Sequence, residues 1–194
     1  MKISRTIRLA IIILTISILS ILVGCKKNDT TLHKIDEFKW QNYWGRYDSV
    51  KYINAEMTAD TMGRPGLKQW VSVNDATFAR YEFDDYLDAQ VFYEAEWYDE
   101  LTELNENGDF SGYFYSYYKE GDVKLSTSIE KRYTGVLLFN GKFHSDSQEG
   151  NLYGGAYLFD NTVILAYTRN PSAENKTDID DFLKKFEYPV PEKR

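Results

Sequence analysis

The sequence predicts a mainly β protein: an antiparallel meander, either open or closed into a barrel, with a C-terminal helix and a short N-terminal helix. Aromatic residues favour strands, and all 4 Trp, 16 Tyr and 11 Phe of the 194-residue chain follow residue 24. From about residue 67, short apolar runs alternate with turn residues, which is typical of β structure. Successive strands pair most simply as a meander, and closure would remove its exposed edges.

The expected strands are apolar or alternating segments bounded by Gly, Asn, Asp or Pro. Asn-Gly pairs between such segments favour hairpins, because glycine adopts positive φ readily. The strands are expected at Leu67–Val73, Phe78–Phe83, Val91–Trp97, Leu101–Leu104, Phe110–Tyr118, Val123–Ile129, Thr134–Phe139, Tyr153–Phe159 and Thr162–Thr168. Turns are expected at Asn107-Gly108, Glu120-Gly121-Asp122, Asn140-Gly141 and Asp160-Asn161, and a bulge at Gly154-Gly155.

Two segments are expected to be helical. Near the C-terminus, Thr177 is a fair N-cap, acidic residues follow it, Lys184 and Lys185 lie near the end, and Pro189 stops the helix. The apolar stripe of this helix is Ile179, Phe182, Leu183 and Phe186. The shorter N-terminal helix is expected within Ile35–Tyr47. Between residues 76 and 104 the spacing of Phe78, Tyr81, Leu87, Val91 and Ala95 also fits a helix, but strands are favoured there.

The first 24 residues have the pattern of a secretory signal. A basic start with Lys2, Arg5 and Arg8 precedes the apolar run Leu9–Val23. A bilayer core of ~30 Å needs about 20 helical residues, so this run is short for a permanent span. Residues 1–24 are therefore interpreted as a signal peptide.

The run closes on Leu22-Val23-Gly24-Cys25, which resembles the lipobox of bacterial lipoprotein precursors. This resemblance implies cleavage between Gly24 and Cys25, a diacylglyceryl group on the Cys25 sulfur, and further acylation (a palmitate-type anchor) at the new amino terminus. Cys25 is the only cysteine of the chain, which also suits an acylation site better than a disulfide framework. The alternative is an uncleaved signal anchor that contains a cysteine by chance.

The resemblance also implies a location in the cell envelope. The residue after the cysteine is Lys26 and not Asp, which by the sorting rule of enterobacterial lipoproteins implies the outer membrane, facing the periplasm, if the source is Gram-negative. Downstream, residues 25–37 are expected to be a flexible tether and residues 38–194 a single β-rich domain.

The charge of the mature chain excludes one class of partner. Cleavage removes three of the 23 basic residues and none of the 30 acidic ones, which leaves a net charge of −10. Because a chain with this net negative charge repels phosphate backbones, we expect no nucleic-acid partner. It would also be held off anionic lipid, so membrane attachment is expected to depend on the anchor at Cys25.

Few residues suggest catalysis. The two histidines, His33 and His144, lie far apart in sequence, no zinc-binding motif or phosphate loop is present, and we expect no cofactor, no metal and no catalytic residue. A triad with His144 and the neighbouring Ser145-Asp146-Ser147 has little support. Glu94 and Glu96 share one face of an expected strand beside Trp97, which leaves a glycan hydrolase as an alternative.

Tyrosine density in Gly112–Tyr118 is the most suggestive feature. On a strand, Tyr113, Tyr115 and Tyr117 share one face, and together with Trp97 they are the candidate ligand-binding residues. Ordinary cross-strand packing is the competing explanation. The segment Trp44–Tyr47, the expected hairpin after Leu101 and the final strand followed by a helix are weakly similar to lipocalin-like β-barrels in architecture alone.

These observations favour a membrane-anchored envelope lipoprotein that is a non-enzymatic binding module, more an interaction protein than an enzyme. Its partner is expected to be an envelope protein or a small apolar ligand. The alternatives are the glycan hydrolase and a periplasmic inhibitor or immunity lipoprotein.

Overall fold

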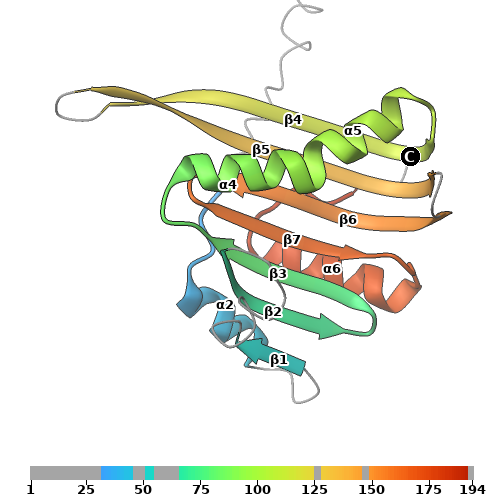
Figure 1. Cartoon of the computed structure of the whole chain (residues 1–194). Coiled ribbons are helices and arrows are strands. Elements are labelled where there is room, and N and C mark those ends of the chain that lie inside the picture. The colour runs from blue at the N-terminus through green and yellow to red at the C-terminus, as the bar shows by residue number, and fades with distance from the viewer. Residues whose placement is uncertain (1–31, 46–50, 55–65, 125–127, 146–148, 192–194) are drawn as a thin grey trace, which may run out of the picture. The chain divides into compact units, whose positions relative to one another are not determined.

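A computed structural model describes residues 32–45, 51–54, 66–124, 128–145 and 149–191, and they contain one antiparallel sheet (Figure 1). The strands stand in the order β1-β2-β3-β7-β6-β5-β4. Their bounds are β1 Lys51–Asn54, β2 Leu67–Val73, β3 Ala76–Glu82, β4 Phe110–Lys124, β5 Ile129–His144, β6 Glu149–Phe159 and β7 Thr162–Thr168. The helices are α2 Glu37–Trp44, α4 Tyr86–Tyr93, the π-helix η2 Glu94–Tyr98, α5 Asp99–Glu106 and α6 Ala173–Lys185.

The sheet consists of two meanders that meet at β3 and β7. β1, β2 and β3 form one, and β4 to β7 form the other in reverse order. Between them the chain crosses from β3 to the far edge through α4, η2 and α5. The mainly β antiparallel prediction is confirmed. Because β1 and β4 lie at opposite edges of the described sheet, it is open, and the closed-barrel alternative is wrong.

Helices cover both faces of the sheet, so the domain has two cores. On one face, α2 and α6 bring Trp40, Trp44 and Phe182 onto Phe78 of β3. On the other face, α4, η2 and α5 cross in front of the strands in Figure 1 and pack on the opposite side chains of the same strands. The central strands β6 and β7 are consequently buried on both faces, since two helical layers exclude water from them.

The segment from residue 86 to 106 is helical, and the strands expected at Val91–Trp97 and Leu101–Leu104 are wrong. Asp85 begins α4 as its N-cap, and its carboxylate accepts the backbone N–H groups of Leu87 and Asp88. Helical spacing then places Ala89 and Tyr93 against the sheet. The N-cap and the burial of Ala89 and Tyr93 on one side of α4 decided against the period of two, whereas Leu87 and Val91 of the expected helical spacing are exposed.

Three expected turns also differ. Asn107-Gly108 ends α5 instead of joining two strands, with Gly108 at φ 81°. The other two, Glu120-Gly121-Asp122 and Asn140-Gly141, lie inside β4 and β5. Gly141 pairs with Gly112, and a Cβ added at Gly141 would collide with the carbonyl oxygen of Ser111. Glycine here allows close approach of two strands, which sequence alone does not distinguish from a turn.

Of the two features expected in β6 and after it, one is confirmed and one is wrong. Asp160-Asn161 forms the predicted two-residue turn, with Asp160 at φ 55°. The predicted bulge at Gly154-Gly155 is wrong, because both residues keep regular register with β5 and β7. Gly154 instead adopts φ 140° where the backbone of β7 comes close.

Both predicted helices at the ends of the domain are confirmed. The C-terminal helix begins at a Ser172–Asn175 capping box and not at Thr177, and it buries Ile179, Phe182 and Leu183 as expected. The N-terminal helix α2 is capped by Asp36.

The described chain is already packed before α2 begins. Leu32 and Ile35 are buried in the core, so residues 32–36 of the expected tether belong to the domain. The predicted signal peptide, its cleavage site at Gly24 and Cys25 lie outside the described residues. Within the described part, no helix has the length and apolar character needed to cross a bilayer.

Candidate functional site

The candidate tyrosines lie on β4, an edge strand of the sheet. Tyr113, Tyr115 and Tyr117, called the tyrosine row below, point to the face that carries α2 and α6. Tyr113 and Tyr117 are half-buried against that core, and Tyr115 between them is 38% exposed. The predicted sharing of one face is confirmed for these three residues. Trp97 packs on the opposite face and does not join them.

Tyr115 stays exposed because the helices on its face lie over other strands. α6 packs on β3, β6 and β7. The chain after α6 reaches β6, where the Tyr157 hydroxyl donates to the carbonyl oxygen of Pro189 at 2.7 Å and the Tyr188 ring packs on the Tyr157 ring. The partners of the row on β5 are Asn140, Leu138 and Val136. The row therefore lies beyond the helical cover, at the margin of the core.

The outer edge of β4 has the composition of a strand that accepts a partner. No described strand pairs with this edge. The first nine of its 15 residues, Phe110–Tyr118, include no charged side chain, whereas the last six include Lys119, Glu120, Asp122 and Lys124. Protected edges usually carry lysine, proline or a bulge. A 15-residue edge with a long uncharged aromatic stretch can form backbone hydrogen bonds to an extended peptide.

The other face of β4 is tied to the helices. The Tyr118 hydroxyl donates to Glu94 Oε1 at 2.6 Å, and Gln90 Nε2 donates to the same oxygen at 3.2 Å. The Tyr118 ring stacks between Tyr93 and Tyr133. Burial, followed by the Glu94 carboxylate, raises the pKa of the Tyr118 hydroxyl far above its ordinary value of 10.0. Tyr118 therefore stays neutral, and this cluster fastens η2 to the sheet.

Glu94 and Glu96 do not share a strand face, which was the observation that suggested a pair of carboxylates for glycan hydrolysis. Both lie on the π-helix and not on one strand face. Glu94 is half-buried against Tyr118, whereas Glu96 is exposed. Trp97 is fitted between Phe139 and Tyr167 on the sheet.

A polar pocket lies at the end of β4, β5 and β6. It has a volume of about 560 Å³, and its lining includes Asp109, Ser111, Lys142, His144 and Glu149. His144 Nδ1 lies 3.7 Å from Glu149 Oε2, and both side chains are strongly exposed. Most of the Ser145-Asp146-Ser147 motif lies outside the described residues. In the described chain no three His, Cys, Asp or Glu side chains gather as a metal site would require.

A buried charge cluster on β3 was not anticipated from the sequence. Arg80 is only 2% exposed, and its guanidinium donates to Gln69 and, at 2.6 Å, to Glu82. The Lys34 ammonium donates to Glu82 at 2.7 Å and to Asn161 at 3.1 Å. The position of Arg80 inside the largely apolar strand Ala76–Glu82 could have indicated this cluster, since a buried cation needs a partner.

The ionisation of Glu82 follows from this cluster. Burial alone would raise the pKa of the Glu82 carboxyl, but the hydrogen bonds and charges of Lys34 and Arg80 together lower it below 4.5. The carboxylate therefore stays charged and holds residues 32–36 on the sheet.

Comparison with protein-family models, with curated proteins and with solved structures finds no match to this chain. The assignment of a function therefore depends on the sequence motifs and on the geometry of β4.

Proposed function

We propose that the chain is a membrane-anchored lipoprotein of the bacterial envelope whose domain binds an extended segment of an envelope protein along β4. The observation that carries the binding role is the uncharged edge Phe110–Tyr118, with the tyrosine row beside it. The lipobox at Leu22–Cys25 supports the anchor. The domain is proposed to be non-enzymatic.

The binding mode follows from the properties of an edge strand. Backbone groups along the outer edge of β4 would supply affinity by pairing with a partner strand. Side chains of the added strand alternate between faces, so every second one would meet the tyrosine row. Tyrosine is well suited to this contact, because it offers a large apolar surface with little loss of rotamer entropy.

An extended protein segment fits this site better than a small apolar ligand. Small ligands are held in concave sites that enclose most of their surface. Tyr113 and Tyr117 already fill space against the core, and Tyr115 stands out between them. The row therefore forms a strip along an open edge, which suits a strand.

The test is site-specific photo-crosslinking in the intact envelope of the source cell. A photo-reactive amino acid replaces Tyr115, and a matched control places it at the exposed Glu174 on α6. We expect one defined protein adduct from position 115 that position 174 does not give. Equal adducts from both positions, or none from position 115, would contradict the proposal.

Two lysine variants separate edge pairing from side-chain contact. Tyr115→Lys introduces a charge on the face of the row, and Ser116→Lys introduces it on the other face of the same strand, where Ser116 is exposed. In both variants the photo-reactive amino acid replaces Tyr113, and pairing along the edge predicts that both lower its adduct yield. Contact through the tyrosines alone predicts that only Tyr115→Lys does so.

A further inference from the structure

The helical crossover between β3 and β4 has an exposed outer side. α4, η2 and α5 follow one another without a break over residues 86–106 and cross in front of the strands in Figure 1. Ala89 and Tyr93 of α4 are buried against the sheet. Leu87 and Val91, four residues apart, share the opposite side of α4, where they are 52% and 63% exposed. They form an apolar pair that faces away from the sheet.

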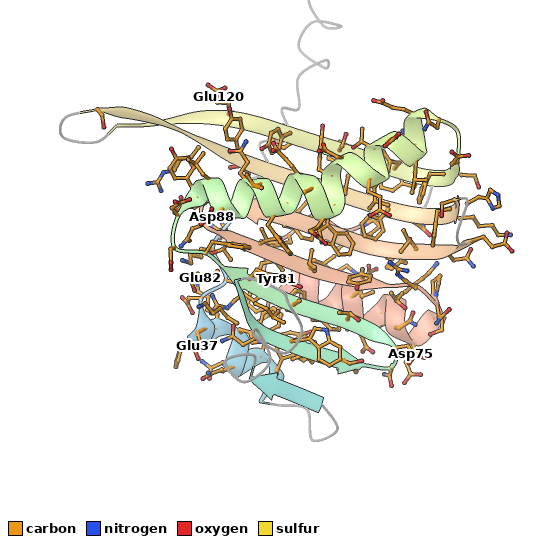
Figure 2. All side chains as sticks on the ribbon, in the orientation of Figure 1. Glu37, Asp75, Tyr81, Glu82, Asp88 and Glu120 are labelled. Carbon is orange, nitrogen blue, oxygen red and sulfur yellow. The ribbon has the colours of Figure 1, made fainter. Side chains whose placement is uncertain are left out.

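The crossover also holds most of the negative charge of the protein. Residues 81–118 include eleven acidic side chains and no lysine, arginine or histidine, whereas the rest of the chain after residue 24 has 20 basic and 19 acidic residues. Figure 2 shows one of these acidic residues, Asp88, near the start of the crossover. The exposed acidic side chains of the three helices are Asp88, Glu96, Asp99, Glu100, Glu103 and Glu106. Together with Leu87 and Val91 they are called the crossover face below.

No cationic side chain of the described chain forms an ion pair with these six carboxylates. Asp99 and Glu103 are four residues apart, and like charges at this spacing destabilise a helix. Glu103 and Glu106 lie in the last turn of α5, which has no basic residue and where the helix dipole favours a cation. A cationic partner would remove both costs when it binds.

We propose that the crossover face is a second binding surface, which takes a lysine- or arginine-rich segment of a protein. Apolar side chains of this segment would cover Leu87 and Val91, and its cations would meet the carboxylates of α5. The crossover packs on the face of the sheet opposite to the tyrosine row. The inference therefore goes beyond the proposed function and does not depend on it.

Charge complementarity selects this occupant. Anionic lipid and nucleic acid would be repelled by the six carboxylates, and a second copy of this acidic chain would add further negative charge. A metal ion alone gives Leu87 and Val91 no role, and within the described residues no three acidic side chains lie close enough to ligate one. A basic polypeptide suits both parts of the surface, because it can carry apolar and cationic side chains together.

The order of the two parts along the crossover restricts the segment further. Val91 and Glu103 are twelve residues apart, which at a rise of about 1.5 Å per residue separates them by roughly 18 Å. A partner helix fits this arrangement when its apolar side chains and its cations lie about three turns apart and are not interspersed.

Fluorescence anisotropy with a designed peptide tests the proposal. The protein, as matured by its source cell, is placed in phosphatidylcholine nanodiscs, and empty nanodiscs give the background. The probe is a labelled alanine-based helical peptide with two leucines about one turn apart at one end and lysines about three turns away. A control peptide of the same composition mixes the leucines and lysines along its length.

We expect the first peptide to bind about threefold or more tightly than the mixed peptide. Val91→Ser should weaken its binding by about threefold or more, because it removes apolar contact. Asp99→Asn together with Glu103→Gln should weaken it by about fivefold and reduce its dependence on salt, because two charges that attract the lysines are lost.

Each variant has a matched control away from the crossover. Phe38→Ser on α2, and Glu174→Gln together with Asp181→Asn on α6, change exposed residues of the same kind and should alter the affinity by less than about twofold. Thermal unfolding shows whether every variant is folded. Equal weakening by the two double variants overturns the inference, since the peptide would then respond to net charge alone. Absence of binding, equal binding of both peptides, or an affinity that Val91→Ser leaves unchanged overturns it as well.

Discussion

The two faces of β4 differ in what covers them, although they belong to one strand. On one face, Tyr118 stacks between Tyr93 and Tyr133 and its hydroxyl is held by Glu94, so the strand is fastened to the helices of the crossover. On the other face, α6 covers β3, β6 and β7, and Tyr115 is exposed. Tyrosine thus holds the strand to the helices on one face, whereas on the other face Tyr115 is exposed and is proposed to contact a partner. What distinguishes them is the position of the helices, which residue type alone does not reveal.

The largest change in the free energy of unfolding is expected where α2 and α6 pack on the sheet. Phe182 of α6 is fully buried and contacts the rings of Trp40, Trp44 and Phe78. Phe182→Ala should lower the free energy of unfolding by about 3–5 kcal/mol, because it removes apolar contact and leaves a cavity. Chemical denaturation measures this. The exposed Phe38→Ala is the control, expected within about 0.5 kcal/mol of wild type.

Removing one hydroxyl on the fastened face should have a moderate effect. Tyr118→Phe leaves Glu94 without its donor on β4, and a hydrogen bond to a charged group contributes roughly 1.5–3 kcal/mol when buried, less at this partly exposed site. We expect a loss of about 1 kcal/mol in the free energy of unfolding. Tyr115→Phe on the open face should change it by less than about 0.5 kcal/mol. Equal losses in both variants would contradict the difference between the faces.

Acid should weaken the attachment of residues 32–36 to β3. The pKa of Glu82 is lowered in the folded state, so its contribution to stability is fully present above the unfolded value near 4.5 and is lost as the pH falls through the folded value. Glu82→Gln should therefore flatten the decline of unfolding free energy with pH below about 4.5. Denaturation at pH 7, 5, 4 and 3 measures the slope, and the exposed Glu174→Gln should leave it unchanged.

The smallest effect on stability, with a large one on binding, is expected at the open face. Tyr115→Ser should change the free energy of unfolding by less than about 0.5 kcal/mol, since this side chain is 38% exposed. The crosslinked adduct at position 113 should nevertheless fall severalfold, because a tyrosine at the centre of an interface carries much of its energy. An unchanged adduct yield in a folded Tyr115→Ser variant would remove the tyrosine row from the binding site.

Sequence reasoning succeeded where local rules decide the structure. The strand Leu67–Val73 is confirmed, and so is the turn at Asp160-Asn161, because strand alternation and positive-φ residues are local properties. The stripe of α6 is likewise confirmed by the burial of Ile179, Phe182 and Leu183. The parity of Tyr113, Tyr115 and Tyr117 follows from strand geometry alone.

Sequence reasoning failed where one segment fitted two periodic patterns, or where contacts with a segment distant in sequence determined the structure. Residues 91–97 alternate with period two, yet Asp85 caps a helix and Ala89 and Tyr93 bury its stripe. Asn140-Gly141 has a turn composition, yet Gly141 faces Gly112 across two paired strands. No local signal shows that Lys34 meets Glu82, because the two residues are 48 positions apart.

The sequence by itself determined the mainly β antiparallel class and the face on which the tyrosine row lies, since each depends on neighbouring residues, and it predicts the anchor at Cys25, which stays a prediction. Tertiary structure decided that the sheet is open, that a helical crossover covers one face of β4, and that residues 32–36 are fixed to β3. These features arise from contacts between segments far apart in the chain. Their free energy depends on which surfaces meet, and periodicity along one segment does not record that.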